Sequence, residues 1–157
     1  MTHSSHVPLV RDVMATNIVL LHEDMGIYEA LQMLLRHKDT GACVVRDHEL
    51  VGILSEKDCL RLFANAAYNQ SPGGDVKHYM STQVTTIGPD EDIFSAAGVF
   101  LENSYHRLPV LEHGKLIGLI SRRDVLEGSR HVWEETFGKK PWTDAKYLTD
   151  EIKAALE

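Results

Sequence analysis

One short pattern in this sequence places a hydroxyl group and a carboxylate at the start of a predicted helix. It reads glycine, two apolar residues, serine, two further residues and aspartate, and it occupies positions 52–58. A strand that ends at Ser55 leaves the serine hydroxyl beside the unpaired N–H groups of the next helix, where the helix dipole favours an anion such as phosphate. Three residues later, the carboxylate of Asp58 can accept hydrogen bonds from both hydroxyls of a vicinal diol, as acidic residues do for ribose. The pattern therefore suits a nucleotide.

The same residues have a second, purely structural interpretation. A serine followed three residues later by an acidic residue is a capping box, in which each side chain accepts a hydrogen bond from the backbone N–H of the other. A single copy would favour this interpretation. The pattern recurs at 118–124, however, where Ser121 and Asp124 take the places of Ser55 and Asp58. Two copies at the same position of a larger repeat favour a nucleotide site.

The larger repeat covers most of the chain. Val10–Leu60 aligns with Val76–Leu126 at an offset of 66 residues without a gap, and 13 of the 51 positions are identical. A fixed internal period is the signature of repeated structural units. We expect an α/β protein made of two similar units related by a pseudo-twofold axis, with clefts where the units meet.

Each copy predicts the same order of elements, β-α-β-β-α. The expected strands of the first copy are the short apolar runs 18–21, 41–45 and 50–54. Those of the second copy are 84–87, 107–111 and 116–120. Apolar residues at a 3.6-residue spacing predict a helix after Asp24, its expected N-cap, and a corresponding helix over 92–103. A second helix of each copy begins at Ser55 and at Ser121.

Turn-forming residues and changes in composition indicate where the segments of the chain begin and end. The expected segments are, in order, 1–68 (N-terminal segment and first unit), 69–75 (linker), 76–129 (second unit) and 130–157 (C-terminal helical tail). Pro72, Gly73 and Gly74 mark the linker. The tail carries Trp133 and an apolar stripe, and we expect it to pack on its own domain or on a second subunit rather than on a dedicated partner.

The bulk composition excludes several classes of function. The 157 residues are 43% apolar, as in a globular protein, and the net charge of −7 disfavours broad binding to nucleic acids. No apolar run approaches the roughly 20 residues of a membrane span, and Met1–His6 does not resemble a signal peptide. We therefore expect a cytoplasmic protein without a membrane or nucleic-acid partner. Cys43 and Cys59 are expected to be buried free thiols.

Signals for a metal site or for catalysis are weak. The nine histidines are scattered, with no HxxxH or HExxH spacing, so we expect no bound metal. Neither serine of the two patterns lies in a GxSxG context, and neither cysteine has a neighbouring base. We expect no enzyme activity and no catalytic cofactor.

Several motifs, in the same order in both copies, resemble those of the CBS domain family. They are Val13-Met14 and Tyr79-Met80, which open the copies, the run His-Arg-Leu-Pro-Val at 106–110, and the two Gly-x-x-Ser-x-x-Asp patterns. The chain from Val10 to Gly128 thus resembles a pair of CBS domains, or Bateman module, here expected to stand alone. The resemblance implies two tandem β-α-β-β-α CBS repeats that bind AMP, ADP, ATP or S-adenosylmethionine in two central clefts, and that dimerise through their helices.

The resemblance also implies roles for individual residues. In the second site Asp124 would hold the ribose, and the phosphate would contact Ser121, His106, Arg107 and Arg123. The adenine of that site would be lined by Thr82, Val84, Ile87 and Pro109. The corresponding first site would consist of Asp58, Ser55, Thr16, Ile18 and Leu21.

The two expected sites are unequal. Thr40-Gly41 stands in the first copy where His106-Arg107 stands in the second, so the first site keeps only Lys57, and Lys38 nearby, as basic residues of its own. Arg107 could also reach across from the other repeat. We expect the Asp124 cleft to bind a phosphorylated ligand more tightly, because a charge-assisted hydrogen bond contributes on the order of 1.5–3 kcal/mol.

These observations predict an adenine-nucleotide sensor that changes conformation or association when its ligand binds. It is expected to form a homodimer and to act on an unidentified target protein. The alternative is a ligand-free structural or dimerisation module, in which both Gly-x-x-Ser-x-x-Asp patterns only cap helices. A third class, a nucleotide-hydrolysing enzyme, predicts turnover of ATP, and we expect none.

Overall fold

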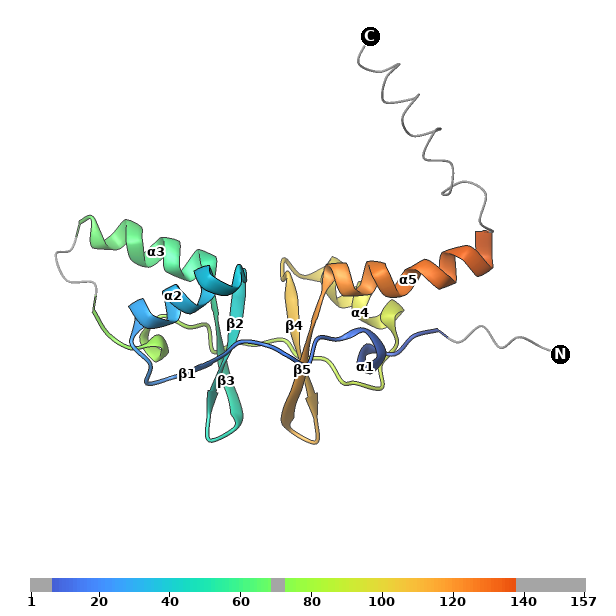
Figure 1. Cartoon of the computed structure of the whole chain (residues 1–157), viewed down its shortest axis with the longest axis horizontal. Coiled ribbons are helices and arrows are strands. Elements are labelled where there is room, and N and C mark those ends of the chain that lie inside the picture. The colour runs from blue at the N-terminus through green and yellow to red at the C-terminus, as the bar shows by residue number, and fades with distance from the viewer. Residues whose placement is uncertain (1–6, 69–72, 138–157) are drawn as a thin grey trace, which may run out of the picture.

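The computed structural model describes residues 7–68 and 73–137, and it places two α/β units side by side (Figure 1). The first unit contains β1 (Leu20–His22), α2 (Ile27–His37), β2 (Gly41–Arg46), β3 (Glu49–Ser55) and α3 (Glu56–Ala66). The second unit contains α4 (Ile93–Glu102), β4 (Arg107–Glu112), β5 (Lys115–Ser121) and α5 (Arg122–Phe137). Two short helices precede the units, α1 (Val10–Val13) and the 3-10 helix η1 (Val76–His78). The predicted α/β fold of two repeats is confirmed.

Each unit is built around a β-hairpin. In the first unit β2 pairs antiparallel with β3, and β1 adds to β2 in parallel. In the second unit β4 and β5 form the hairpin alone. The helices lie on one side of the molecule, and the hairpin turns project from the other (Figure 1).

The predicted strand at 84–87 is wrong, since only Ile87 of that run pairs, in an isolated bridge to Val110. The first unit shows why. There Leu20, one residue before the middle of β1, pairs with Cys43. The counterpart of Cys43 is Pro109, which has no N–H to donate. The parallel pairing therefore does not extend back from Ile87 over 84–86.

Asp24 is not the N-cap of α2, which contradicts our prediction. The N-cap is Gly26, and no side chain caps this helix. In the second unit the cap is Asp92, whose Oδ1 accepts the N–H of Ser95 at 2.8 Å. Because Gly26 is the counterpart of Asp92, the first copy lacks the acid at the capping position.

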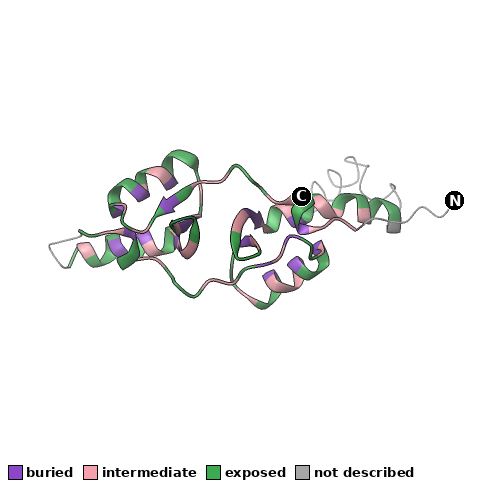
Figure 2. Ribbon diagram, turned by 90° about the horizontal axis from the view of Figure 1, so that it is seen from below, coloured by how far each residue is buried: buried purple, intermediate pink, exposed green. Residues whose placement is uncertain are grey.

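The two copies exchange their opening segments, residues 7–19 and 73–85, which we call the first and second crossing segments. Val10 is fully buried in the same cluster as Ile93 and Leu108 of the second unit. Val76 is equally buried in the core of the first unit. Figure 2 shows the buried residues gathered inside each unit, with chain crossing between the units on both sides. Each core is therefore completed by the opening segment of the other copy.

Matched backbone bonds hold the two crossings. Ala15 exchanges two N–H to carbonyl hydrogen bonds with Leu119, both 2.9 Å long, and Ser81 makes the same pair of bonds with Ile53. These four residues are counterparts at the offset of 66. The pseudo-twofold symmetry predicted from the repeat is therefore present in the backbone.

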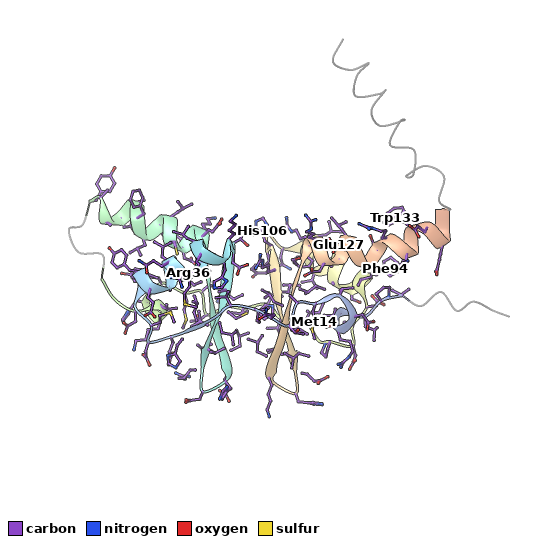
Figure 3. All side chains as sticks on the ribbon, viewed as in Figure 1. Met14, Arg36, Phe94, His106, Glu127 and Trp133 are labelled. Atoms are coloured by element: carbon purple, nitrogen blue, oxygen red, sulfur yellow. The ribbon has the colours of Figure 1, made fainter. Side chains whose placement is uncertain are left out.

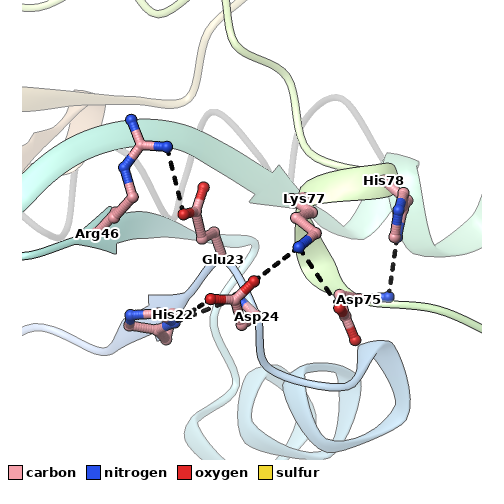
Figure 4. A network of polar contacts seen from close by, with 7 residues as sticks. All are labelled: His22, Glu23, Asp24, Arg46, Asp75, Lys77 and His78. Carbon is pink, nitrogen blue, oxygen red and sulfur yellow. Dashed lines mark hydrogen bonds and ion pairs between the residues drawn. The ribbon is translucent and has the colours of Figure 1, made fainter.

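Ion pairs attach the opening segments at their outer ends. Lys77 Nζ lies 2.8 Å from Asp24 Oδ1 in the network of Figure 4, and the counterpart pair joins Arg11 Nε to Asp90 Oδ1 at 2.9 Å. The hydrogen bond from Lys77 lowers the pKa of Asp24. Asp24 thus fixes the crossing segment rather than a helix end.

Helix α5 runs on to Phe137, past the expected boundary at 129, so the first part of the expected tail continues the last helix of the repeat. The rest of the tail, 138–157, lies outside the described residues, and the domain boundaries remain a prediction. No helix within 7–68 and 73–137 has the length and apolar character needed to cross a bilayer.

Candidate functional site

Both Gly-x-x-Ser-x-x-Asp patterns form complete capping boxes. Asp124 Oδ2 accepts the N–H of Ser121 at 2.8 Å, and Ser121 Oγ accepts the N–H of Asp124 at 3.1 Å. The corresponding distances for Ser55 and Asp58 are 2.9 and 3.2 Å. Each box uses only one of the two carboxylate oxygens, so capping and ligand binding are compatible.

The second carboxylate oxygen distinguishes the two copies. Asp58 Oδ1 lies 3.4 Å from Arg61 Nη1, and the Ser55 hydroxyl donates to Asp58 Oδ2 at 2.9 Å. The counterpart of Arg61 is Glu127, which pairs instead with Arg123 at 3.2 Å. Within the described part of the chain, Asp124 Oδ1 has no hydrogen-bond partner. Asp124 therefore keeps an acceptor for a ligand, while both oxygens of Asp58 are engaged.

A pocket of about 350 Å³ opens at this carboxylate, and we call it the Asp124 pocket. Its walls come from the start of α5, the first crossing segment and the end of α2. The lining residues are Ala15, Asn17, Ile18, Val19, His37, Asp39, Gly41, Arg107, Leu119, Ser121 and Asp124. Its volume lies within the range typical of small-molecule sites, and apolar and polar groups both face it.

A second pocket of about 540 Å³ adjoins the first, and we call it the Lys57 pocket. Its polar lining residues are Thr40, Ser55, Glu56, Lys57, Ser104, Tyr105, His106 and Arg107. Gly41, Arg107 and Leu119 line both pockets. The two cavities therefore meet at the junction of the hairpins, with Arg107 between them.

The structure corrects the predicted grouping of the site residues. Ile18 was assigned to the site of Asp58, but it lines the Asp124 pocket. The exchange of opening segments is the cause, because it carries Ala15 to Leu119 of the second unit. Val84 is half-buried, and it lines neither pocket. Ile18 therefore lies with Asp124 rather than with Asp58, and the adenine contacts themselves stay a prediction.

Other residues predicted to contact the ligand lie outside both pockets. Leu21, Ile87 and Pro109 are buried in the cores, and none of them lines either pocket. Thr16 and Thr82 are exposed and also lie outside both pockets. The apolar strand positions were read as a binding surface, whereas their side chains point into the packed core.

The basic residues are also distributed differently from the prediction. His106, exposed near the start of β4 (Figure 3), shares the Lys57 pocket with Ser55 rather than lying with Ser121. Arg123 is 86% exposed, pairs with Glu127, and lines neither pocket. Arg107 alone among the predicted phosphate contacts of the second site reaches both cavities.

Charge separates the two pockets. The Asp124 pocket contains two carboxylates, from Asp39 and Asp124, and one guanidinium, that of Arg107. The Lys57 pocket contains two cations, Lys57 and Arg107, and one carboxylate, that of Glu56. The cationic pocket is therefore the better place for the phosphate end of a ligand.

Cys43 lines the Lys57 pocket but is a poor nucleophile. It is buried, as predicted, and desolvation raises the pKa of its thiol to about 12. The thiol is therefore neutral at physiological pH. Nor do His, Cys, Asp and Glu side chains gather in threes at any place in the described ranges where they could hold a metal ion.

His37, Asp39 and Asn17 also line the Asp124 pocket, although their positions in the sequence did not predict it. They belong to no motif, and they reach the Asp124 pocket only because the first crossing segment and the end of α2 meet the second unit there. Asp39 lies in the first copy, at a position whose counterpart in the second copy is Tyr105.

Relatives of this chain share both its sequence pattern and its fold. A protein of Methanocaldococcus jannaschii, MJ1225, is 29% identical over 119 residues, which cover 75% of this chain and 41% of that protein. A 17.7 kDa protein of Acidianus ambivalens is 29% identical over 133 residues, which cover 83% of this chain and 78% of that one. The chain thus spans less than two thirds of the first relative and most of the second.

Solved structures agree with the fold. Two structures of CBSX2, a CBS-pair protein of Arabidopsis thaliana, match with TM-scores of 0.71 and 0.72 at 28% and 26% identity. They cover 80% and 81% of this chain and 98% and 97% of CBSX2, and the first is a complex with AMP. The family model for the CBS domain matches residues 10–65 and 76–131. With both repeats matched, this chain belongs to the CBS domain family.

Proposed function

We propose that this chain is a regulatory module that binds an adenosine nucleotide in the Asp124 pocket. The observation that carries the proposal is Oδ1 of Asp124, which has no partner among the described residues and lies at a helix N-terminus in a pocket with polar and apolar walls. The CBSX2 structure with AMP, at 28% identity, supports an adenosine ligand.

In this proposal each part of the ligand has a matching surface. Asp124 Oδ1 accepts hydrogen bonds from the ribose hydroxyls. The adenine packs against Ile18 and Val19, and the 5′-phosphate lies towards Ser121 and Arg107. Longer phosphate chains extend past Arg107 towards the cations of the adjoining Lys57 pocket.

We still expect the two sites to differ in ligand affinity, but for a reason other than the one given by the sequence. The Asp124 pocket is the primary nucleoside site because Asp124 keeps a free acceptor, whereas Arg61 occupies the second oxygen of Asp58. His106 and Arg107 together do not explain the difference between the sites, because His106 lies in the Lys57 pocket. A second ligand in the Lys57 pocket would have to displace Arg61 to reach Asp58.

Isothermal titration calorimetry with adenosine and AMP on two matched variants tests the proposal. Asp124→Asn keeps a capping oxygen but weakens acceptance from the ribose, and we expect adenosine affinity to fall about tenfold or more. Asp58→Asn makes the same chemical change at a carboxylate that is already paired, and we expect little effect. Equal losses in both variants, or no binding to the wild-type chain at millimolar ligand, would contradict the proposal.

A second candidate, a ligand-free dimerisation module, has its own supporting observation. The helices expose apolar side chains at matching positions of both copies: Tyr28 and Phe94, Leu35 and Leu101, Leu60 and Leu126. We propose that these helix faces form a homodimer interface, which is compatible with either function. Sedimentation of Leu35→Lys and Leu101→Lys variants tests the interface, and a monomeric wild-type chain would exclude it. A dimer that no adenosine ligand stabilises would favour the purely structural role.

A further inference from the structure

The Asp124 pocket contains an acidic residue that the proposed binding mode does not use. Asp39 follows α2, and its backbone N–H donates to the carbonyl of Leu34 at 3.1 Å, which fixes its position. Its Oδ1 lies 2.7 Å from Arg107 Nη1, and the two side chains are only 21% and 29% exposed. Both line the pocket. The main cation available to a phosphate is therefore already paired with a carboxylate.

This pair opposes the binding of a phosphate. The guanidinium of Arg107 can offer its other donors, but a phosphate that contacts them lies close to the Asp39 carboxylate and is repelled by it. A phosphate that takes the position of Asp39 instead must break a charge-assisted hydrogen bond in partly buried surroundings. An uncharged nucleoside encounters neither cost.

We infer that Asp39 is a specificity-determining residue that competes with the ligand's phosphate for Arg107 and so limits the preference of this pocket for AMP over adenosine. The inference rests on the proposed function and adds to it a residue of the first copy. The counterpart of Asp39 in the second copy is Tyr105, which has no carboxylate, so the second copy has no matching competitor.

The competition between Asp39 and the phosphate for Arg107 also links ligand binding to the relative orientation of the two units. Asp39 comes from the first unit and Arg107 from the second, so their ion pair ties the units together beside the pocket. A phosphate that draws Arg107 away removes this tie, whereas adenosine leaves it in place. Phosphorylated and unphosphorylated ligands therefore differ in how they affect the relative orientation of the units.

The test is the ratio of AMP affinity to adenosine affinity, measured by calorimetry on the full chain. In Asp39→Asn we expect this ratio to rise about tenfold, because AMP gains access to Arg107 while adenosine binding stays nearly the same. The matched control is Asp24→Asn, which removes one charge from another ion pair between the copies, 2.8 Å long, and lines neither pocket. Its ratio is expected to equal that of the wild-type chain.

A double-mutant cycle isolates the competition for Arg107 from simple repulsion. In an Arg107→Ala background we expect Asp39→Asn to leave the ratio unchanged. A persistent gain in that background, or an unchanged or lower ratio in the single variant, would overturn the inference while the proposed function stands. Asp39→Ser, checked by circular dichroism for native folding, provides a second variant with the same expectation. If neither adenosine nor AMP binds the wild-type chain or any variant, the proposed function fails and this inference with it.

Discussion

At the scale of single residues, the glycine of each Gly-x-x-Ser-x-x-Asp pattern has a role separate from any ligand. A Cβ on Gly118 would lie 2.6 Å from Met14 Sδ and 2.9 Å from the carbonyl oxygen of Ala15, and Figure 3 shows Met14 beside β5. A Cβ on Gly52 would meet Met80 and Ser81 at 2.7 Å. Both glycines are required because a crossing segment passes directly over the strand. The pattern thus combines a packing residue with a capping box and, at Asp124, a free acceptor.

The first prediction concerns this close approach. Gly118→Ala is expected to destabilise the chain by about 1–3 kcal/mol, since the backbone of the crossing segment must shift to admit the methyl group. Gly98→Ala is the control, because a Cβ there meets nothing within 4 Å and the residue lies inside α4. That change is expected to stabilise by up to about 1 kcal/mol through helix propensity. Urea unfolding of both variants measures the difference, and equal midpoints would contradict the packing role of Gly118.

At the scale of elements, much of the fold could be predicted, while the assembly of the site could not. Apolar runs and serine caps located both hairpins and the helices α2, α3, α4 and α5, because those signals are local. The strand at 84–87 failed because Pro109, in the neighbouring strand β4, lacks the backbone donor that Cys43 has in the first unit. Ile18 was grouped with Asp58 but lies in the Asp124 pocket, because a repeat in sequence does not reveal that opening segments change places. No motif predicts the ion pair of Asp58 with Arg61 or that of Asp39 with Arg107, because both depend on side-chain geometry.

The second prediction uses the ion pair that holds the second crossing segment to the first unit. Lys77 lowers the pKa of Asp24 in the folded chain, so Asp24 contributes stability above the ordinary aspartate pKa, near 3.9. This contribution is lost as the pH falls through the lowered pKa, where Asp24 becomes protonated. Asp24→Asn should therefore melt below the wild-type chain at pH 7, and the difference should shrink as the pH falls below about 4. Thermal melting across this range measures it, and a difference that does not vary with pH would contradict the assignment to Asp24.

At the scale of the whole molecule, the units of sequence and the units of structure differ. Each copy of the repeat supplies a helix pair and a hairpin to one core and an opening segment to the other. The Asp124 pocket lies where these contributions meet, with walls from both copies. A ligand there contacts the first crossing segment, the end of α2 and the start of α5 together. Binding is therefore expected to stabilise both units at once rather than the second unit alone.

The third prediction tests the exchange of opening segments directly. Val10 belongs to the first copy in sequence, but it is buried with Ile93 and Leu108 in the core of the second unit. Val10→Ala should cost on the order of 2 kcal/mol and should accelerate amide hydrogen exchange in α4, β4 and β5 more than in α2, β2 and β3. Val76→Ala, its counterpart in the core of the first unit, should show the reverse distribution. Faster exchange confined to the copy that carries the substitution would show that each repeat folds on its own opening segment, and would contradict the exchanged arrangement.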